Sequence, residues 1–446
     1  MDRQGLLARL RDIVGPEYVT DEPFILMAYT QDFGTQPPRW PLCAVKPGNA
    51  AEIAAILRLA NELGVPVSPR GAGSAQEGGC QSDGGILLET LRLDRLLDID
   101  EDTGTVTAQT GLTFVKLMDI LEQRGWKIGI APSGAMAGTL GAHVSRPGIG
   151  WGNVKYVSQG HQVLGLKAVL PSGEIVSTGT GANPAASTFF RYALGPDLTG
   201  LFVGSEGAFG VITEVTLRMY PLPEKVYLER YVGTSLRDGI EIFRELAHHD
   251  LVCFISVPVI KPDSLLFDVN VEGDAVEVDH RVERIRAIVA RYPSFRCEGP
   301  EAPQTFWTYR WFHTGEEFKD GIAAAVTFFL PFSKLESATL LMREIMQRHG
   351  IAKFSQQMFP EPTGSEHVSL LFHHPGDQEA YVRLQAALPE MMDAALAMGG
   401  CPYTKGRQWA PHLQAHLGGM GYWSMLKTLK RALDPNNIMN PGVIGL

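Results

Sequence analysis

The stretch Val65–Ala75 constrains this chain more than any other feature of its sequence. It reads VPVSPRGAGSA and follows residues 49–63, whose apolar side chains recur at helical spacing between a capping Asn49 and a terminating Gly64. The glycines therefore come directly after a strand–helix–strand unit. Glycine lets a backbone approach a ligand closely, and successive main-chain N–H groups can bind a pyrophosphate. The pattern is neither GxGxxG nor GxxxxGK[ST], so it predicts neither a Rossmann fingerprint nor a P-loop; a simple turn is the alternative.

Three further segments rich in small residues follow along the chain. Residues 132–143 read PSGAMAGTLGAH, and so many small side chains allow a flat ring system to lie against the backbone; the alternative is a long flexible loop. Residues 204–214 read GSEGAFGVITE, a glycine-rich turn running into a strand. Residues 434–442 read DPNNIMNPG near the C-terminus.

In this order and spacing, the four segments resemble those of the FAD-linked oxidoreductases of the vanillyl-alcohol oxidase and p-cresol methylhydroxylase superfamily. The resemblance covers about Gly34–Pro223 and continues more weakly to the C-terminus. It implies an FAD site made of Arg70, Gly71, Ala72, Gly73 and Ser74 at the pyrophosphate, Pro132, Ser133, Gly138, Thr139, Gly141 and Ala142 along the isoalloxazine and ribityl chain, Val211 and Ile212 at the adenine, and Asn440 closing over the ring.

Some members of that superfamily attach FAD covalently through a histidine in the pyrophosphate loop. Residues 73–75 of this chain are Gly, Ser and Ala, so we expect noncovalent FAD. His143, the last residue of the second segment, is a further candidate for contact with the cofactor and keeps a covalent link as the alternative.

The resemblance and the order of elements predict an α+β protein in three parts. Residues 1–222 would form a two-subdomain FAD-binding domain of the p-cresol methylhydroxylase type. Residues 223–410, where strands such as 226–232 alternate with amphipathic helices such as 235–248, would form a cap or substrate domain with an antiparallel sheet. Residues 411–446 would return to the FAD site.

The cap region looks like that of the D-lactate, D-2-hydroxyglutarate and glycolate dehydrogenases. In that family an Arg and a Thr, matching Arg310 and Thr314 here, hold the substrate carboxylate; an arginine fork suits two carboxylate oxygens. A structural ion pair is the alternative for Arg310. By this resemblance the chain would oxidise a small alcohol or 2-hydroxy acid by hydride transfer to flavin N5, with His374, His373 or His367 as the base.

The same family carries two metal-binding histidines, and His367 and His374 keep their seven-residue separation. The residues between them do not match, and the acidic ligand expected further along is missing. No metal is therefore expected, although His367 and His374 keep that alternative open.

Tyr403 and Arg407 favour a different substrate. A Tyr and an Arg near the flavin could stabilise a phenolate, as in the phenol-oxidising branch, so an oxidase or dehydrogenase of phenolic or benzylic alcohols is the second hypothesis. A third, of another class, is a flavin subunit of a larger electron-transfer complex. Oligomerisation is possible in each case.

Composition and charge limit the kinds of partner that we expect for this chain. The formal charge is −10 without a long basic run, which argues against nucleic acid. No apolar stretch approaches the roughly 20 residues that span a bilayer, and the charged N-terminus predicts an amphipathic helix, so a cytoplasmic location is expected. The five cysteines are scattered, so a quinone, a cytochrome or a separate iron–sulfur subunit would take the electrons.

Overall fold

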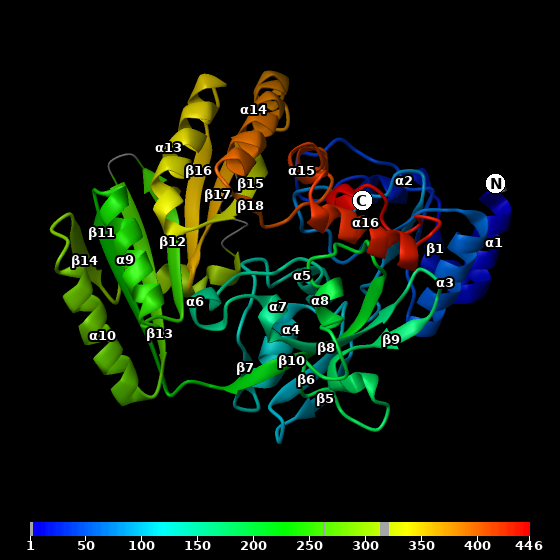
Figure 1. Cartoon of the computed structure of the whole chain (residues 1–446), viewed down its shortest axis with the longest axis horizontal. Coiled ribbons are helices and arrows are strands. Elements are labelled where there is room, and N and C mark those ends of the chain that lie inside the picture. The colour runs from blue at the N-terminus through cyan, green and yellow to red at the C-terminus, as the bar shows by residue number, and fades with distance from the viewer. Residues whose placement is uncertain (1–2, 262–263, 313–320) are drawn as a thin grey trace.

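The computed structural model describes residues 3–261, 264–312 and 321–446. Thr314, expected to bind substrate, lies outside these ranges. The described chain has the expected α+β architecture, with three sheets and helices packed against them (Figure 1). In these ranges no helix is both long and apolar enough to cross a membrane.

A small sheet near the N-terminus carries the first glycine-rich loop. Its spatial order is β1 (Val19–Thr20), β2 (Cys43–Val45), β4 (Ile86–Glu89) and β3 (Val67–Arg70), and the last three strands are parallel. Helix α3 (Ala50–Leu63) joins β2 to β3. Asn49 Oδ1 caps it by accepting from the Glu52 N–H at 2.9 Å, and Gly64 ends it with a φ of 64°. The loop leaves the carboxyl end of parallel strand β3, where ligands commonly bind.

A second, antiparallel sheet completes the FAD-binding region. Its order is β5 (Leu96–Asp100), β6 (Thr105–Gln109), β10 (Val211–Pro221), β8 (Val163–Val169) and β9 (Ile175–Ser177), and β7 (Trp126–Ile128) also pairs with β10. Helices α4 (Phe114–Glu122) and α5 (Leu140–Val144) bury Phe114, Leu117 and Leu140 in the core of this sheet. The short helices of this part are α6 (Asn153–Tyr156), α7 (Gln159–Gln162) and α8 (Thr199–Phe202).

The cap contains an eight-stranded antiparallel sheet. Its order is β14 (Phe295–Gly299), β11 (Lys225–Gly233), β13 (Ser264–Gly273), β12 (Phe254–Lys261), β16 (Phe354–Glu361), β17 (Gly364–His373), β15 (Ile322–Leu330) and β18 (Cys401–Pro402). The helices α9 (Leu236–His248), α10 (Ala275–Val289), α13 (Phe332–Arg348) and α14 (Gln378–Ala397) cover one face (Figure 1). Alternate residues of the strands point to the opposite face, which is free to form a site.

The C-terminal segment returns to the first sheet. After α15 (Ala410–Leu417) and α16 (Gly421–Leu433), Met439 forms a parallel bridge with Val67, and the Asn440 N–H donates to Val67 O at 2.8 Å. The buried Lys430 ammonium fixes this segment, because it donates to the Asp434 carboxylate at 2.6 Å and to the carbonyl oxygen of Met439 at 2.6 Å. The last residues are thus attached to the strand that carries the glycine-rich loop.

Candidate active site

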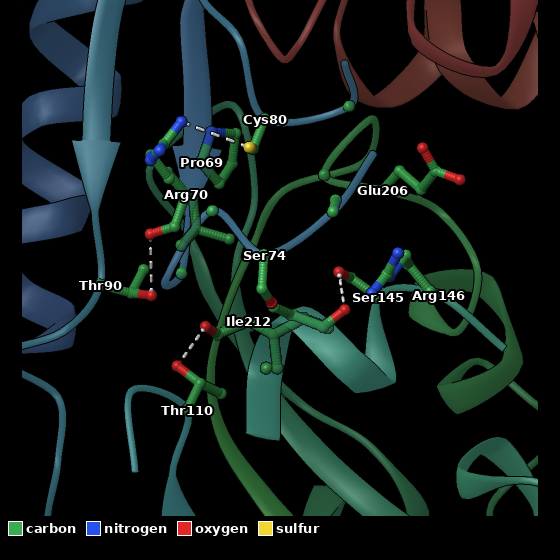
Figure 2. A pocket seen from close by; sticks show the side chains of 18 of the residues that line it. Pro69, Arg70, Ser74, Cys80, Thr90, Thr110, Ser145, Arg146, Glu206 and Ile212 are labelled. Carbon is green, nitrogen blue, oxygen red and sulfur yellow. Dashed lines mark hydrogen bonds between the residues drawn. The ribbon is translucent and has the colours of Figure 1, made fainter. Parts of the chain in front are cut away.

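Two adjoining cavities open where the loop after β3, helix α5 and the turn before β10 meet. The first, here called the phosphate pocket, lies between the two sheets of the FAD-binding region (Figure 2). Residues expected to bind FAD that line it are Arg70, Gly71, Gly73, Ser74, Gly141, Ala142, Val211 and Ile212. Ala72 belongs to the same loop but lines neither cavity.

The backbone of the loop suits an anion. In the described chain, none of the amides of residues 72–75 donates a hydrogen bond to the protein. Partly buried N–H groups are nearly always paired, so consecutive free donors beside a pocket fit a ligand that accepts several hydrogen bonds. A pyrophosphate is such a ligand. The residues present therefore fit the phosphate portion of FAD.

Packing explains why two of these residues are glycines. A Cβ on Gly71 would lie 2.4 Å from Thr139 Oγ1 and 3.0 Å from the Ala142 Cβ, so the loop and α5 approach too closely for a side chain. Gly73 has a φ of 74°, and its Cβ would lie 2.2 Å from the Arg70 guanidinium. Both glycines bring the two sides of the pocket together.

The Arg70 side chain supports the loop. Its Nη1 donates to Gln31 O at 3.0 Å, and the guanidinium lies 5.5 Å from the centre of the Tyr29 ring. In Figure 2 it points towards Cys80 and away from Ser74. Arg70 therefore orders the chain beneath the loop, while its neighbours present their amides to the pocket.

The second cavity, here called the ring cavity, adjoins the phosphate pocket and measures about 580 Å³. The residues Ser74, Glu77, Ala142 and Arg146 line both cavities, so the two are continuous around them. From the expected flavin segment, the ring cavity is lined by Pro132, Ser133, Gly138, Thr139, Ala142 and His143. Thr139 Oγ1 is buried and has no hydrogen-bond partner in the parts of the chain described, which leaves it available to a bound cofactor.

His143 is a buried, neutral side chain at this cavity. Its Nε2 lies 3.2 Å from Ile149 O, and its ring packs edge-on against Phe114. Burial, assisted by the nearby Arg146, lowers the pKa of His143 to about 3. The imidazole is thus uncharged at neutral pH. Noncovalent attachment of FAD stays a prediction.

The cap contributes the opposite wall of the ring cavity. Aromatic rings dominate it: Trp151 stands between Phe254 at 4.6 Å and Phe306 at 5.5 Å, measured between ring centroids, and Phe359 lies beyond Phe254. The polar side chains on the cap side are Ser256, Thr327, Gln357, Glu366 and Tyr403. This wall is therefore flat and mostly apolar, with a few hydrogen-bonding groups.

Besides His143, four ionisable side chains line the ring cavity: Glu77, Arg146, Glu366 and Tyr403. Glu366 is 4% exposed, and burial, with the charges of Glu361 and Glu77, raises its pKa well above the ordinary value. The Tyr403 hydroxyl accepts from the Ile149 N–H at 3.1 Å, and burial raises its pKa too. Arg146 lies 3.6 Å from the Glu77 carboxylate. The cavity therefore contains the Tyr403 hydroxyl, the Glu366 carboxyl with its raised pKa, and the ion pair of Arg146 with Glu77.

Arg310, expected to hold the substrate carboxylate, lies apart from the ring cavity, and that role stays a prediction. Arg310 begins η4 (Arg310–Phe312), directly after α11 (Gln304–Thr308), and its guanidinium lies 4.2 Å from the ring centre of Trp307 and 4.4 Å from that of Trp311. It lines a separate pocket on the far side of Trp151 and does not line the ring cavity.

Arg407, expected to contact the substrate, does not line the ring cavity, and that contact stays a prediction. Its Nη2 donates to Gln81 O at 3.1 Å and to Asn440 Oδ1 at 3.0 Å, and its Nη1 donates to Pro441 O. Burial lowers its pKa to about 10, which leaves it charged. Arg407 thus ties the C-terminal segment to the loop that follows β3.

Asn440 has a similar connecting role. Its Nδ2 donates to Gly79 O at 2.8 Å and to Glu206 O at 2.7 Å. It lines neither cavity, and its closing over the flavin ring stays a prediction. Its amide joins three parts of the chain that border the phosphate pocket.

The three candidate histidines lie outside the ring cavity and apart from one another. His367 is fully buried towards the helices of the cap, stacked on Phe328 at 5.1 Å, and burial lowers its pKa to about 3. His373 and His374 lie at the far end of β17, partly or fully exposed. Six residues of extended strand separate His367 from His373 by roughly 20 Å. His367 and His374 therefore cannot share a metal, and among the described residues no three potential ligands form a metal site.

Arg146 and Glu366 are functional candidates that the sequence interpretation missed. Arg146 follows the second small-residue segment by three positions, and Glu366 directly precedes His367. A charge inside a strand-like stretch was the available signal for Glu366. Trp151, which separates two pockets, carried no comparable signal.

Comparison with known proteins agrees with this geometry. Residues 41–179 match the family model described as FAD binding domain, and residues 257–444 match that of FAD linked oxidases, C-terminal domain. The chain is 27% identical to glycolate oxidase subunit GlcD of Bacillus subtilis, over 97% of this chain and 95% of that protein. It is 26% identical to the mitochondrial D-lactate dehydrogenase [cytochrome] of Arabidopsis thaliana, over 90% and 73% of the two chains.

Solved structures share the fold at lower identity. P-cresol methylhydroxylase superposes with a TM-score of 0.90 at 17% identity, covering 99% of this chain and 96% of that one. The 4-ethylphenol oxidase of Gulosibacter chungangensis gives 0.87 at 19%, covering 99% and 97%. The chain belongs to the FAD-linked oxidoreductases with the p-cresol methylhydroxylase fold. It is an enzyme that binds FAD, as the resemblance implied.

Proposed function

We propose that this enzyme oxidises a flat aromatic substrate, a para-alkylphenol or benzylic alcohol, bound in the ring cavity. The observation that carries the proposal is the wall of Trp151, Phe254 and Phe359, interrupted by the hydroxyl of Tyr403 and the carboxyl of Glu366. Aromatic walls with few polar groups favour planar apolar ligands. The hypothesis of a 2-hydroxy-acid substrate depended on Arg310 and the three candidate histidines, and these residues lie outside the ring cavity.

The chain's own residues would orient the substrate and stabilise its charge. Tyr403 accepts one hydrogen bond from Ile149, so its own proton is free to be donated to a substrate oxygen. The positive charge of Arg146 would stabilise that oxygen as an oxyanion. Glu366, whose pKa is raised by burial, would be a further hydrogen-bonding group at another point of the cavity. The bound FAD would supply the hydride acceptor.

A 2-hydroxy acid is the second candidate, and the sequence relatives favour it. GlcD and the Arabidopsis enzyme carry names that refer to glycolate and D-lactate. In that case Arg146 would be the partner of the substrate carboxylate, because it is the arginine that lines the ring cavity.

Anaerobic bleaching of the flavin absorbance separates the two candidates. The purified FAD-loaded protein is mixed with 4-ethylphenol, vanillyl alcohol, glycolate, D-lactate or D-2-hydroxyglutarate. Rapid bleaching by the aromatic compounds alone supports the first proposal, and bleaching by hydroxy acids alone overturns it. Admitting air afterwards tests the acceptor, since rapid return of the flavin colour indicates an oxidase and slow return indicates another acceptor, such as a quinone, a cytochrome or an iron–sulfur subunit.

A further inference from the structure

A separate pocket lies between the FAD-binding region and the cap, on the far side of Trp151 from the ring cavity. This interdomain pocket measures about 220 Å³ and is bounded by α4 and β7 on one side and by β11, β13 and the Trp307–Trp311 segment on the other. Trp151 and Trp311 line both it and the ring cavity, so they form the partition between the two. Nothing in the proposed reaction uses this pocket.

Among the described residues Arg310 has no salt-bridge partner, and the carboxylate that raises its pKa is that of Glu122 at the rim of the pocket. The Arg310 guanidinium is held between the indoles of Trp307 and Trp311, and its Nη1 donates to Trp307 O at 2.6 Å. Arginine has five N–H donors, and Nη1 makes the one hydrogen bond that the group forms with the described part of the protein. Burial lowers the pKa to about 10, which still leaves the group charged at neutral pH. A partly buried charge without a salt-bridge partner favours the binding of an anion.

The other polar groups of the pocket indicate which kind of ligand it would bind. Lys127 is already neutralised, because its Nζ donates to both oxygens of Glu272 at 2.6 and 2.7 Å. Asn270 is 2% exposed, and its Nδ2 has no hydrogen-bond partner in the described part of the chain. Glu122 lies at the exposed rim. The interior therefore offers one cation without a salt-bridge partner and one unmatched amide donor beside flat indole rings.

We propose that the interdomain pocket is a second ligand site for a small, flat organic anion, of the size and chemistry of an aromatic monocarboxylate. The arginine fork matches two carboxylate oxygens, the Asn270 amide supplies a further donor, and Trp151, Trp307 and Trp311 stack on a ring. The volume holds about one such ring. This site is distinct from the ring cavity, since the Trp151–Trp311 partition separates them.

Calorimetric titration of the FAD-loaded enzyme tests the site, with benzoate as the anion and benzamide as its uncharged counterpart. We expect benzoate to bind and benzamide to bind at least tenfold more weakly, because a hydrogen-bonded charge contributes more than a neutral group. Arg310→Gln should weaken benzoate binding at least tenfold. Arg310→Lys keeps the charge but loses the planar guanidinium, so its affinity for benzoate should lie between those of the wild type and Arg310→Gln. It replaces Arg310→Gln in the test if that variant does not fold. Arg237→Gln, a change at an exposed arginine on α9, is the matched control and should leave binding unchanged.

The flavin spectrum distinguishes this site from the ring cavity. Benzoate in the interdomain pocket should leave the flavin absorbance nearly unchanged at saturation, whereas a ligand against the flavin perturbs it. The proposal is overturned by undetectable benzoate binding, by equal binding of benzoate and benzamide, by binding that Arg310→Gln and Arg310→Lys leave intact, or by a flavin perturbation that follows the titration.

Discussion

Substitution of Glu361 by Gln should stabilise the protein increasingly as the pH rises. Glu361 ends β16, next to the diagonal partner Glu366 on β17, and its Oε1 has no hydrogen-bond partner in the described structure. Burial raises its pKa from the ordinary 4.5 to about 8. Gln has nearly the same shape but never ionises, so it removes the cost of a buried charge.

The sign and size of this change in unfolding free energy follow from the linkage between proton binding and folding. Below the ordinary pKa the carboxyl is protonated in both the folded and the unfolded chain, and the wild type has its full stability. As the pH rises towards about 8, the unfolded chain loses the proton while the folded chain keeps it, so wild-type stability falls relative to the variant. At ~1.4 kcal/mol per pH unit, this interval sets an upper limit of ~5 kcal/mol, reached above the folded pKa. Partial exposure reduces the effect to a few kcal/mol.

Urea unfolding of the FAD-loaded wild type and Glu361→Gln at about pH 5, 7 and 9 measures the difference in unfolding free energy. The variant's advantage should be small at the lowest pH and largest at the highest. Glu379→Gln, at a largely exposed carboxyl on α14, controls for the substitution itself. A Glu361→Gln advantage that stays constant over this range, or that shrinks as the pH rises, would refute the assignment of a buried, proton-binding carboxyl.

Three further substitutions test the site. Gly71→Ala should weaken FAD binding roughly 5- to 150-fold, because the new Cβ would lie 2.4 Å from Thr139 Oγ1 and overpacking costs about 1–3 kcal/mol. Titration of the apoprotein with FAD measures this affinity. An unchanged affinity would contradict the packing argument. Asn440→Ala removes the hydrogen bond to Gly79 O, so it should lower the unfolding temperature and increase the loss of FAD. Thermal melts and measurements of flavin release check these two effects. A loss of turnover with normal FAD retention would instead indicate a direct catalytic contact. Tyr403→Phe should lower kcat about 10²–10³-fold on the accepted substrate with FAD content unchanged, and an unaltered kcat would remove Tyr403 from the reaction.

Local sequence rules accounted for much of the FAD-binding region. Asn49 and Gly64 bound α3 as the capping pattern predicts, and the loop beyond β3 lies beside a pocket. What the rules could not supply was the packing between distant segments. Gly71 meets Thr139 only because α5 folds against the loop, and no local pattern connects residues so far apart in the chain.

Arg310 and Arg407 also show that local sequence rules do not predict contacts between distant segments. They were assigned by residue type and by resemblance, and both are buried and charged in the structure. One is held between indoles in the interdomain pocket, and the other bonds to Gln81 and Asn440. An arginine's role depends on which acceptors surround it, and those acceptors come from remote parts of the sequence.

The contrast between His367 and Glu366 shows how register decides the chemistry of the ring cavity. The two residues are neighbours on β17, yet strand geometry sends their side chains to opposite faces. Pairing with β15 places Glu366 opposite Phe329 and His367 opposite Phe328, whose ring is in the helix-covered core. A shift of one residue would exchange a carboxyl for an imidazole in the cavity and bury the charge among the helices. The apolar core beneath the cap helices fixes the register, and through it determines that the carboxyl of Glu366, and not the imidazole of His367, faces the ring cavity.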